Sequence, residues 1–212
     1  MIITKMKPLD EIEKMIEPYE KIFLLGCNSC AAVCRTGGEE QIKEFYKKFS
    51  GKKKITGSIV AETPCDMRTL RADLRLVRKA VEESDAILVF ACGVGVQTVA
   101  ALTGKIVIPA LNTLFSGQVE RIGVYHELCK FCGDCMLYET VGICPIAICP
   151  VMSVNGPCEY VVDGKCTLLP GRECVWYLIL DRAKSLGLLD LALRYRESRR
   201  YHGALSLKVK EE

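Results

Sequence analysis

The stretch AILVFAC, residues 86–92, is a continuous apolar run that ends in a cysteine. A run this short and this apolar is typical of a strand that is buried on both faces of a parallel sheet. Two similar runs precede it, KIFLL at 21–25 and GSIVAE at 57–62, and KIVIPAL follows at 105–111. Because stretches with helical periodicity separate these runs, the sequence predicts an α/β fold, a small doubly wound parallel sheet.

Helices are expected before the first strand and after each of the first three strands. They are expected over residues 8–19, 29–49, 68–83 and 95–103. In the second of them, Thr36-Gly37-Gly38 is interpreted as a kink rather than a phosphate-binding loop.

After Asn112 the alternation of strands and helices stops, and prolines and cysteines become frequent. We therefore expect two domains. Residues 1–118 form an α/β (Rossmann-like) domain, and residues 119–212 form a cysteine-rich, metal-ordered segment with little sheet of its own. A C-terminal helix over 173–195, broken near Gly187, and a polar tail complete the second domain.

Composition excludes several classes of function. The net charge of +3 on 212 residues is too small to indicate nucleic-acid binding. No run approaches the ~18 apolar residues of a membrane span, and residues 1–23 contain no apolar stretch of signal-peptide length. The expected location is cytoplasmic. A lysine cluster at 47–54 is interpreted as a solvated loop after a helix, with docking on an acidic partner as the alternative.

Thirteen cysteines are the unusual feature of the composition. The length of the chain, the odd cysteine count and the lack of a leader all argue against a disulfide framework. In a reducing compartment, dense cysteine at short spacing indicates metal thiolates. Disulfides and unligated buried thiols are the alternatives.

The first group of cysteines follows the ends of the predicted strands. It comprises Cys27, Cys30, Cys34, Cys65 and Cys92. Because parallel strands deliver their carboxyl ends to one edge of a sheet, these thiols are expected to converge there. Four thiolates suit a [4Fe–4S] cluster or zinc, so one of the five is surplus, and Cys27 can be the one left out.

Gly93-x-Gly95 also resembles the start of a dinucleotide-binding fingerprint. Its third glycine position is Thr98, which makes the signal weak.

The second group lies within 46 residues and contains eight cysteines. Cys129, Cys132 and Cys135 have the CxxCxxC spacing of iron–sulfur proteins, and Cys144 before Pro145 can complete a second cluster. Because eight residues separate Cys135 from Cys144, where a ferredoxin has three, a ferredoxin fold is not expected.

Four cysteines then remain for a second C-terminal site, iron–sulfur or zinc, unless one of them completes the second cluster instead. They are Cys149, Cys158, Cys166 and Cys174. His126 is a candidate nitrogen ligand, although a surface histidine is the simpler interpretation.

Several motifs together suggest a family. They are LGCNSCAAVCRTGG at 25–38, CGVGVQTVA at 92–100, CKFCGDC at 129–135, CPIAICP at 144–150, NGPCE at 155–159 and CVW at 174–176. In this order they resemble the cysteine-rich methylenetetrahydrofolate reductase C-terminal domain family, whose standalone members are the small (MetV-type) subunit of the acetogen methylenetetrahydrofolate reductase complex.

The resemblance implies a partner, a TIM-barrel catalytic subunit that holds a flavin (FMN or FAD) and the folate. This chain would carry iron–sulfur sites, with zinc as an optional further metal. It would pass electrons between that flavin and a donor such as ferredoxin, a hydrogenase or a heterodisulfide-reductase-like module, in the methyl branch of the Wood–Ljungdahl pathway.

No Ser/His/Asp set, HExxH motif or P-loop occurs in the chain, so catalytic residues are not expected. The leading hypothesis is a non-catalytic electron-transfer subunit of an oxidoreductase complex. The alternative is a zinc-stabilised subunit that anchors the reductase to an electron-donating complex. A thiol-redox or nucleotide-binding enzyme is the third hypothesis.

Overall fold

The computed structural model describes residues 1–197, so most of the polar tail lies outside the described residues. The chain divides into two compact units, Met1–His126 and Glu127–Glu212, and each is described here by itself. The boundary expected from the sequence, between residues 118 and 119, falls inside a strand of the first unit.

A parallel sheet of four strands forms the centre of the first unit, in the order β3-β2-β4-β5. The strands are β2 (Lys21–Cys27), β3 (Lys54–Ala61), β4 (Ala86–Phe90) and β5 (Ile106–Pro109). Every residue of β4 is buried, as its apolar run predicted. The strand order reverses between β2 and β4, which is the doubly wound arrangement, so the predicted α/β fold is confirmed.

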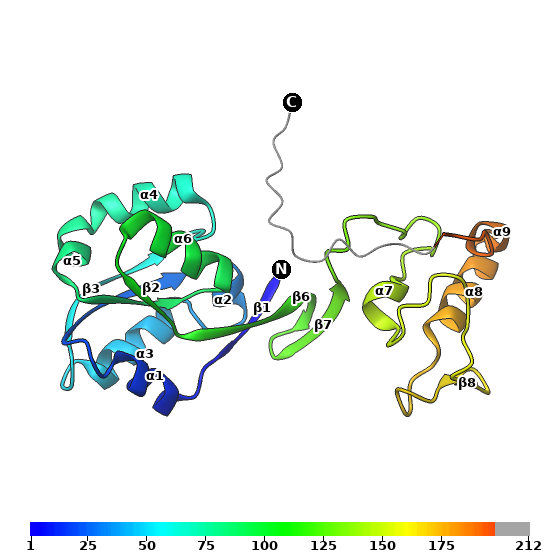
Figure 1. Cartoon of the computed structure of the whole chain (residues 1–212), viewed down its shortest axis with the longest axis horizontal. Coiled ribbons are helices and arrows are strands. Elements are labelled where there is room, and N and C mark those ends of the chain that lie inside the picture. Colours follow the sequence, from blue (N-terminus) through cyan, green and yellow to red (C-terminus); the bar gives the residue numbers. More distant parts are fainter. Residues whose placement is uncertain (198–212) are drawn as a thin grey trace. The chain divides into compact units, whose positions relative to one another are not determined.

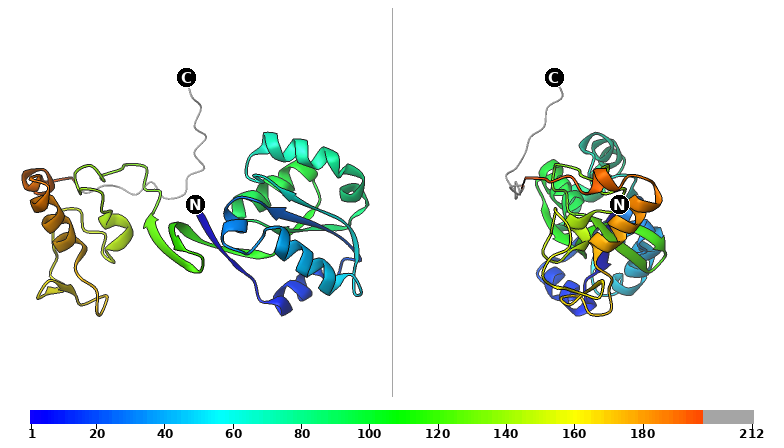
Figure 2. Two further views of the ribbon diagram at one scale, coloured as in Figure 1. Left: turned by 180° about the vertical axis from the view of Figure 1, so that it is seen from behind. Right: turned by 90° about the vertical axis from the view of Figure 1, so that its right-hand side faces the viewer.

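Helices cover both faces of this sheet (Figures 1 and 2). On one face lie α1 (Leu9–Ile16) and α3 (Glu39–Phe49), and on the other lie α4 (Met67–Leu76), α5 (Arg78–Glu83) and α6 (Gly93–Thr103). Both layers bury apolar side chains against the strands, with Phe23 and Phe90 among the fully buried ones. The result is a three-layer core that needs no metal for its packing.

The helix expected over residues 29–49 is wrong as a single element. It is divided into α2 (Cys30–Val33) and α3, and the chain turns between them at the glycines predicted to form a kink. A Cβ atom on Gly37 would lie 2.1 Å from the carbonyl oxygen of Phe90. Only glycine allows the chain to cross so close to the end of β4.

A second sheet in this unit was not expected. Its three strands, in the order β1-β6-β7, are β1 (Ile2–Met6), β6 (Leu111–Arg121) and β7 (Val124–Cys129). The cysteine-rich segment expected over residues 119–212 begins inside β6, and neither β6 nor β7 was expected as a strand. Most of β6 is exposed or half-buried, so it lacks the apolar run of a buried strand. The tight turn at Ile122-Gly123, where Gly123 has a φ of +87°, was the available signal.

The second unit has little regular structure in its described residues. It contains α7 (Pro145–Ile148), the two-residue strands β8 (Val161–Val162) and β9 (Lys165–Cys166), α8 (Val175–Ser185) and α9 (Leu189–Ala192). The predicted break near Gly187 is confirmed, because Gly187 separates α8 from α9 with a φ of +70°.

A small core lies under α8 in this unit. Its buried members are Val141, Cys174, Val175, Trp176, Ile179, Ala183 and Ala192. The indole Nε1 of Trp176 donates a hydrogen bond to the carbonyl oxygen of Ser153 at 2.9 Å. This cluster of seven buried residues is a small core for a unit of this length.

Within residues 1–197, no helix has the length and apolar character that crossing a membrane requires.

Candidate metal centres

The carboxyl ends of the parallel strands place cysteines at one edge of the sheet. Cys27 is the last residue of β2, Cys65 lies in the loop that follows β3, and Cys92 is the N-cap of α6 directly after β4. Cys30 is the first residue of α2 and follows Cys27 through a short turn. The strand order alone accounts for this convergence, because all three strands run parallel.

Neighbouring cysteines influence the pKa of two of these thiols, Cys27 and Cys65. Burial raises the pKa of Cys27, hydrogen bonds from backbone N–H groups of Ala31 and Ser29 lower it, and neighbouring Cys30 and Cys92 raise it further. Each additional thiolate in such a group is unfavourable unless a cation compensates the charge.

Cys65 belongs to the same group. Burial is the largest cause that raises the pKa of Cys65. The charges of the nearby Cys92, Cys30 and Asp66 raise it further. Cys27, Cys30, Cys65 and Cys92 are named below the edge group.

Cys34, the fifth cysteine, has a different surrounding. It is buried, and its Sγ lies 3.9 Å from the carbonyl oxygen of Ile2 on β1, where it can make a weak hydrogen bond. The sequence did not decide which of the five cysteines is surplus and named Cys27 as one option. The geometry associates Cys27 with Cys30 and Cys92, and it associates Cys34 with β1.

Gly95 brings two of the edge-group loops together. A Cβ atom at Gly95 would lie 2.9 Å from Cβ of Ala91 and 3.3 Å from Cβ of Pro64. The first turn of α6, which carries Cys92 at its N-cap, can therefore approach the loop that carries Cys65. The Gly93-x-Gly95 pattern thus has a packing role, and the N–H of Gly93 donates to Oγ1 of Thr113 at 2.8 Å.

The CxxCxxC motif forms a tight loop in the second unit. Phe131 and Gly133 have positive φ values of 52° and 79°, which turns the chain around the cysteines. The N–H of Phe131 donates to Sγ of Cys129 at 3.5 Å. Backbone N–H groups that point at sulfur are typical of thiolate sites, since they stabilise the charged form.

Cys144, the N-cap of α7, lies near this loop. Burial raises the pKa of Cys144, backbone N–H groups of α7 lower it, and nearby Cys132 and Cys129 raise it. Three of the four cysteines expected in the second cluster are therefore neighbours. The fourth, Cys135, is exposed in the same loop region.

The last four cysteines line one cavity. Cys149, Cys158, Cys166 and Cys174 surround a space of about 30 Å³ whose other walls are largely aliphatic. Two hydrogen bonds hold this arrangement: Cys174 N–H donates to the Gly164 carbonyl at 2.8 Å, and Cys166 N–H donates to the Arg172 carbonyl at 3.0 Å. These bonds tie the β8–β9 hairpin to the start of α8.

Thiols that gather in this way are the donors that iron–sulfur clusters and zinc prefer. The fit rests on donor chemistry and on the mutual proximity of the thiols. Within residues 1–197, no three histidine, cysteine, aspartate or glutamate side chains are arranged tightly enough to hold a single metal ion. His126, the candidate nitrogen ligand, instead pairs with Glu120 at 2.6 Å.

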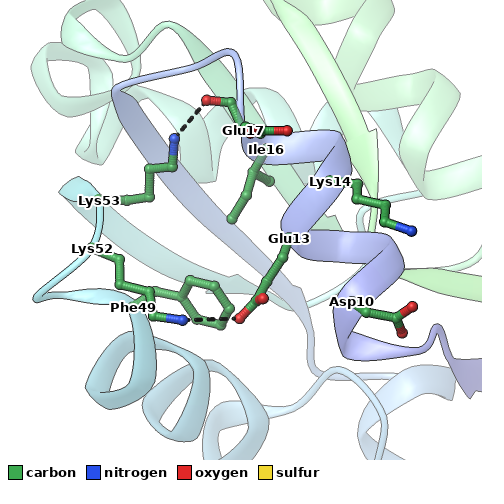
Figure 3. Close-up of a pocket in the computed structure, with 8 residues that line it drawn as sticks. All are labelled: Asp10, Glu13, Lys14, Ile16, Glu17, Phe49, Lys52 and Lys53. Carbon is green, nitrogen blue, oxygen red and sulfur yellow. Dashed lines mark hydrogen bonds and ion pairs between the residues drawn. The ribbon is translucent and has the colours of Figure 1, made fainter.

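Another cavity of the first unit, of about 340 Å³, lies where α1 ends and β3 begins, and none of the described cysteines lines it (Figure 3). Its lysines have structural partners: Lys52 pairs with Glu13 at 3.2 Å, and Lys53 donates to the carbonyls of Glu17 and Tyr19, both at 2.8 Å. Lys53 thus completes hydrogen bonds at the carboxyl end of α1. Two lysines of the 47–54 cluster are therefore held by contacts within the chain.

The fold and the three cysteine groups define an α/β protein with a thiol-rich C-terminal unit. Residues 108–202 match a protein family described as methylene-tetrahydrofolate reductase C terminal. The match confirms the resemblance for these residues and includes all eight C-terminal cysteines. Residues 1–107 lie outside it. Comparisons with curated proteins and with solved structures gave no match.

Proposed function

We propose that this chain is an iron–sulfur electron-transfer subunit of a methylenetetrahydrofolate reductase. In this role it relays electrons between an external donor and the flavin of a separate TIM-barrel catalytic subunit. The family match at 108–202 supports the link to that reductase. The redox role rests on the cysteines.

The observation that carries the proposal is the edge group. Cys65 and Cys92 are distant in sequence from the pair Cys27 and Cys30, and they join this pair because parallel strands end at one edge. Burial and the charges of neighbouring cysteines both raise the pKa of Cys27 and of Cys65, so these two thiols are poorly suited to exist as free anions. Bound metal relieves both effects.

The residues of the edge group have distinct roles. Cys27 is buried and receives hydrogen bonds from backbone N–H groups, which would favour its thiolate in a metal site. Cys65 is the most exposed of the four and lies nearest to solvent. A [4Fe–4S] cluster held there would supply reversible one-electron transfer, at a potential that these hydrogen bonds and this burial set.

The CxxCxxC loop with Cys144 is proposed as the second cluster site. Its loop N–H groups and its three close thiols are the supporting features. The group around the small cavity is the third site, for a further cluster or for zinc.

Metal and sulfide analysis of anaerobically purified full chain tests the proposal. A brown protein is expected, with iron and acid-labile sulfide in equal amounts and with visible absorbance that bleaches on addition of dithionite. A colourless protein that contains zinc without sulfide would overturn it.

One observation favours the second candidate, a zinc-stabilised docking subunit. The core of the second unit is small, and four cysteines with a partly closed aliphatic surrounding are typical of a structural zinc site. Replacing Cys166 with Ser would then prevent assembly with the catalytic subunit. Electron transfer within complexes that do assemble would remain unchanged.

A further inference from the structure

An arginine-lined groove lies on the helical layer formed by α4, α5 and α6. Arg71, Arg75 and Arg78 border a cavity of about 390 Å³. Leu74, Val81 and Leu102 supply its apolar walls. None of the described cysteines of the first unit lines this groove, so the groove is not part of the edge group.

The arginines follow helical spacing. Arg68, Arg71, Arg75 and Arg78 are separated by three, four and three residues, so they share one face of α4 and its continuation in α5. Ten residues of helix correspond to about 15 Å. The positive charge is therefore a stripe and not a single point.

Among the described residues, ion pairs neutralise only the ends of this stripe. Arg68 pairs with Asp66 at 2.8 Å, and Arg78 pairs with Glu82 at 2.7 Å. Among residues 1–197, neither Arg71 nor Arg75 has an ion-pair partner, although both are exposed. Like charges four residues apart destabilise a helix, so the charges of Arg71 and Arg75 do not stabilise α4.

We propose that this groove docks an acidic protein surface. Guanidinium groups bind carboxylates with two parallel hydrogen bonds, and two unpaired arginines one turn apart match carboxylates spaced along a partner segment. Leu76, at the end of α4, is 82% exposed and offers an apolar contact beside the charges. Arginine with adjacent apolar surface is the usual composition of a protein interface.

Two observations favour a protein over a small phosphorylated ligand. The stripe is longer than one phosphate group, and the arginines are exposed on an open surface instead of being enclosed. The lysine cluster at 47–54 is less suitable for docking, because Lys52 and Lys53 already bond within the chain. The proposal does not require metal at any cysteine group, so it can stand or fail independently of the proposed function.

Fluorescence anisotropy with the full chain and a labelled poly-glutamate peptide tests the proposal. Binding is expected at low salt and should weaken as salt is added. The double variant Arg71→Glu, Arg75→Glu should weaken it by about tenfold or more. The matched control Lys47→Glu, Lys48→Glu changes the net charge equally on exposed residues of α3 and should change binding by less than about twofold.

Three results would overturn the proposal. One is the absence of poly-glutamate binding. Another is equal weakening by both double variants, which would indicate attraction to net charge alone. The third is binding of inorganic pyrophosphate that requires Arg71 and Arg75 while poly-glutamate does not bind, which would identify a small-anion site. A labelled poly-glutamine peptide controls for contacts with the peptide backbone.

Discussion

The thiol of Cys34 lies 3.9 Å from the carbonyl oxygen of Ile2, so it faces the antiparallel sheet and not the other strand-end cysteines. Cys27, by contrast, is influenced by Cys30 and Cys92. We therefore expect Cys34→Ser to leave the metal content of the full chain unchanged and Cys27→Ser to remove the metal of one site. Iron, zinc and sulfide analysis per chain measures both.

Equal metal loss in the two variants would show that Cys34 is a ligand and would contradict the assignment. Cys65→Ser is the positive control. Cys65 belongs to the edge group because both Cys92 and Cys30 raise its pKa.

The parallel sheet could be predicted because its strands are buried on both faces. The run at 86–92 has no polar residue, and its burial leaves few alternatives to a central strand. Once the strands were placed, the rule that parallel strands end at one edge also placed Cys27, Cys65 and Cys92 together. This inference needed no side-chain information.

The second sheet and the choice among five cysteines could not be predicted in this way. β6 pairs with β1, which is far away in the sequence. Such a pairing leaves no periodic pattern in an exposed strand. The same β1 supplies the carbonyl of Ile2 that faces Cys34. Spacing alone therefore could not distinguish Cys34 from Cys27.

Gly37 should tolerate no side chain. In Gly37→Ala the new Cβ atom would lie 2.1 Å from the Phe90 carbonyl oxygen and 2.9 Å from Cβ of Ala31. We expect the free energy of unfolding to fall by about 1–3 kcal/mol, measured by urea denaturation. Gly51→Ala is the matched control, because a Cβ there meets nothing within 4 Å and should change stability by less than about 0.5 kcal/mol. Equal stability of the two variants would mean that the crossing at Gly37 can relax.

Two buried hydroxyl groups connect β1 to the loop after α2. Oγ1 of Thr4 and Oγ1 of Thr36 lie 2.7 Å apart, and Thr36 donates to the Ala31 carbonyl at 3.1 Å. Since Thr36 uses its hydrogen there, Thr4 is the donor of the pair. Thr36→Val leaves the buried Thr4 hydroxyl without a partner and should cost about 1–3 kcal/mol.

A double-mutant cycle checks this pair. The double variant Thr4→Val, Thr36→Val should lose less stability than the sum of the two single losses, because it buries no unpaired hydroxyl. Additive losses in urea denaturation would show that the two hydroxyls are not coupled.

Metal removal should affect the second unit most. Trp176 is the single tryptophan, it is 2% exposed, and it lies in the small core that contains Cys174. If metal at the neighbouring cysteines stabilises this core, chelation under anaerobic reducing conditions should expose the indole and shift its emission to longer wavelength.

Cys166→Ser should produce the same shift without chelator, whereas Cys34→Ser in the first unit should not. Far-ultraviolet circular dichroism should change little, because most helices and strands belong to the first unit with its larger core. An unchanged emission spectrum after complete metal removal would mean that this small core is stable by packing alone.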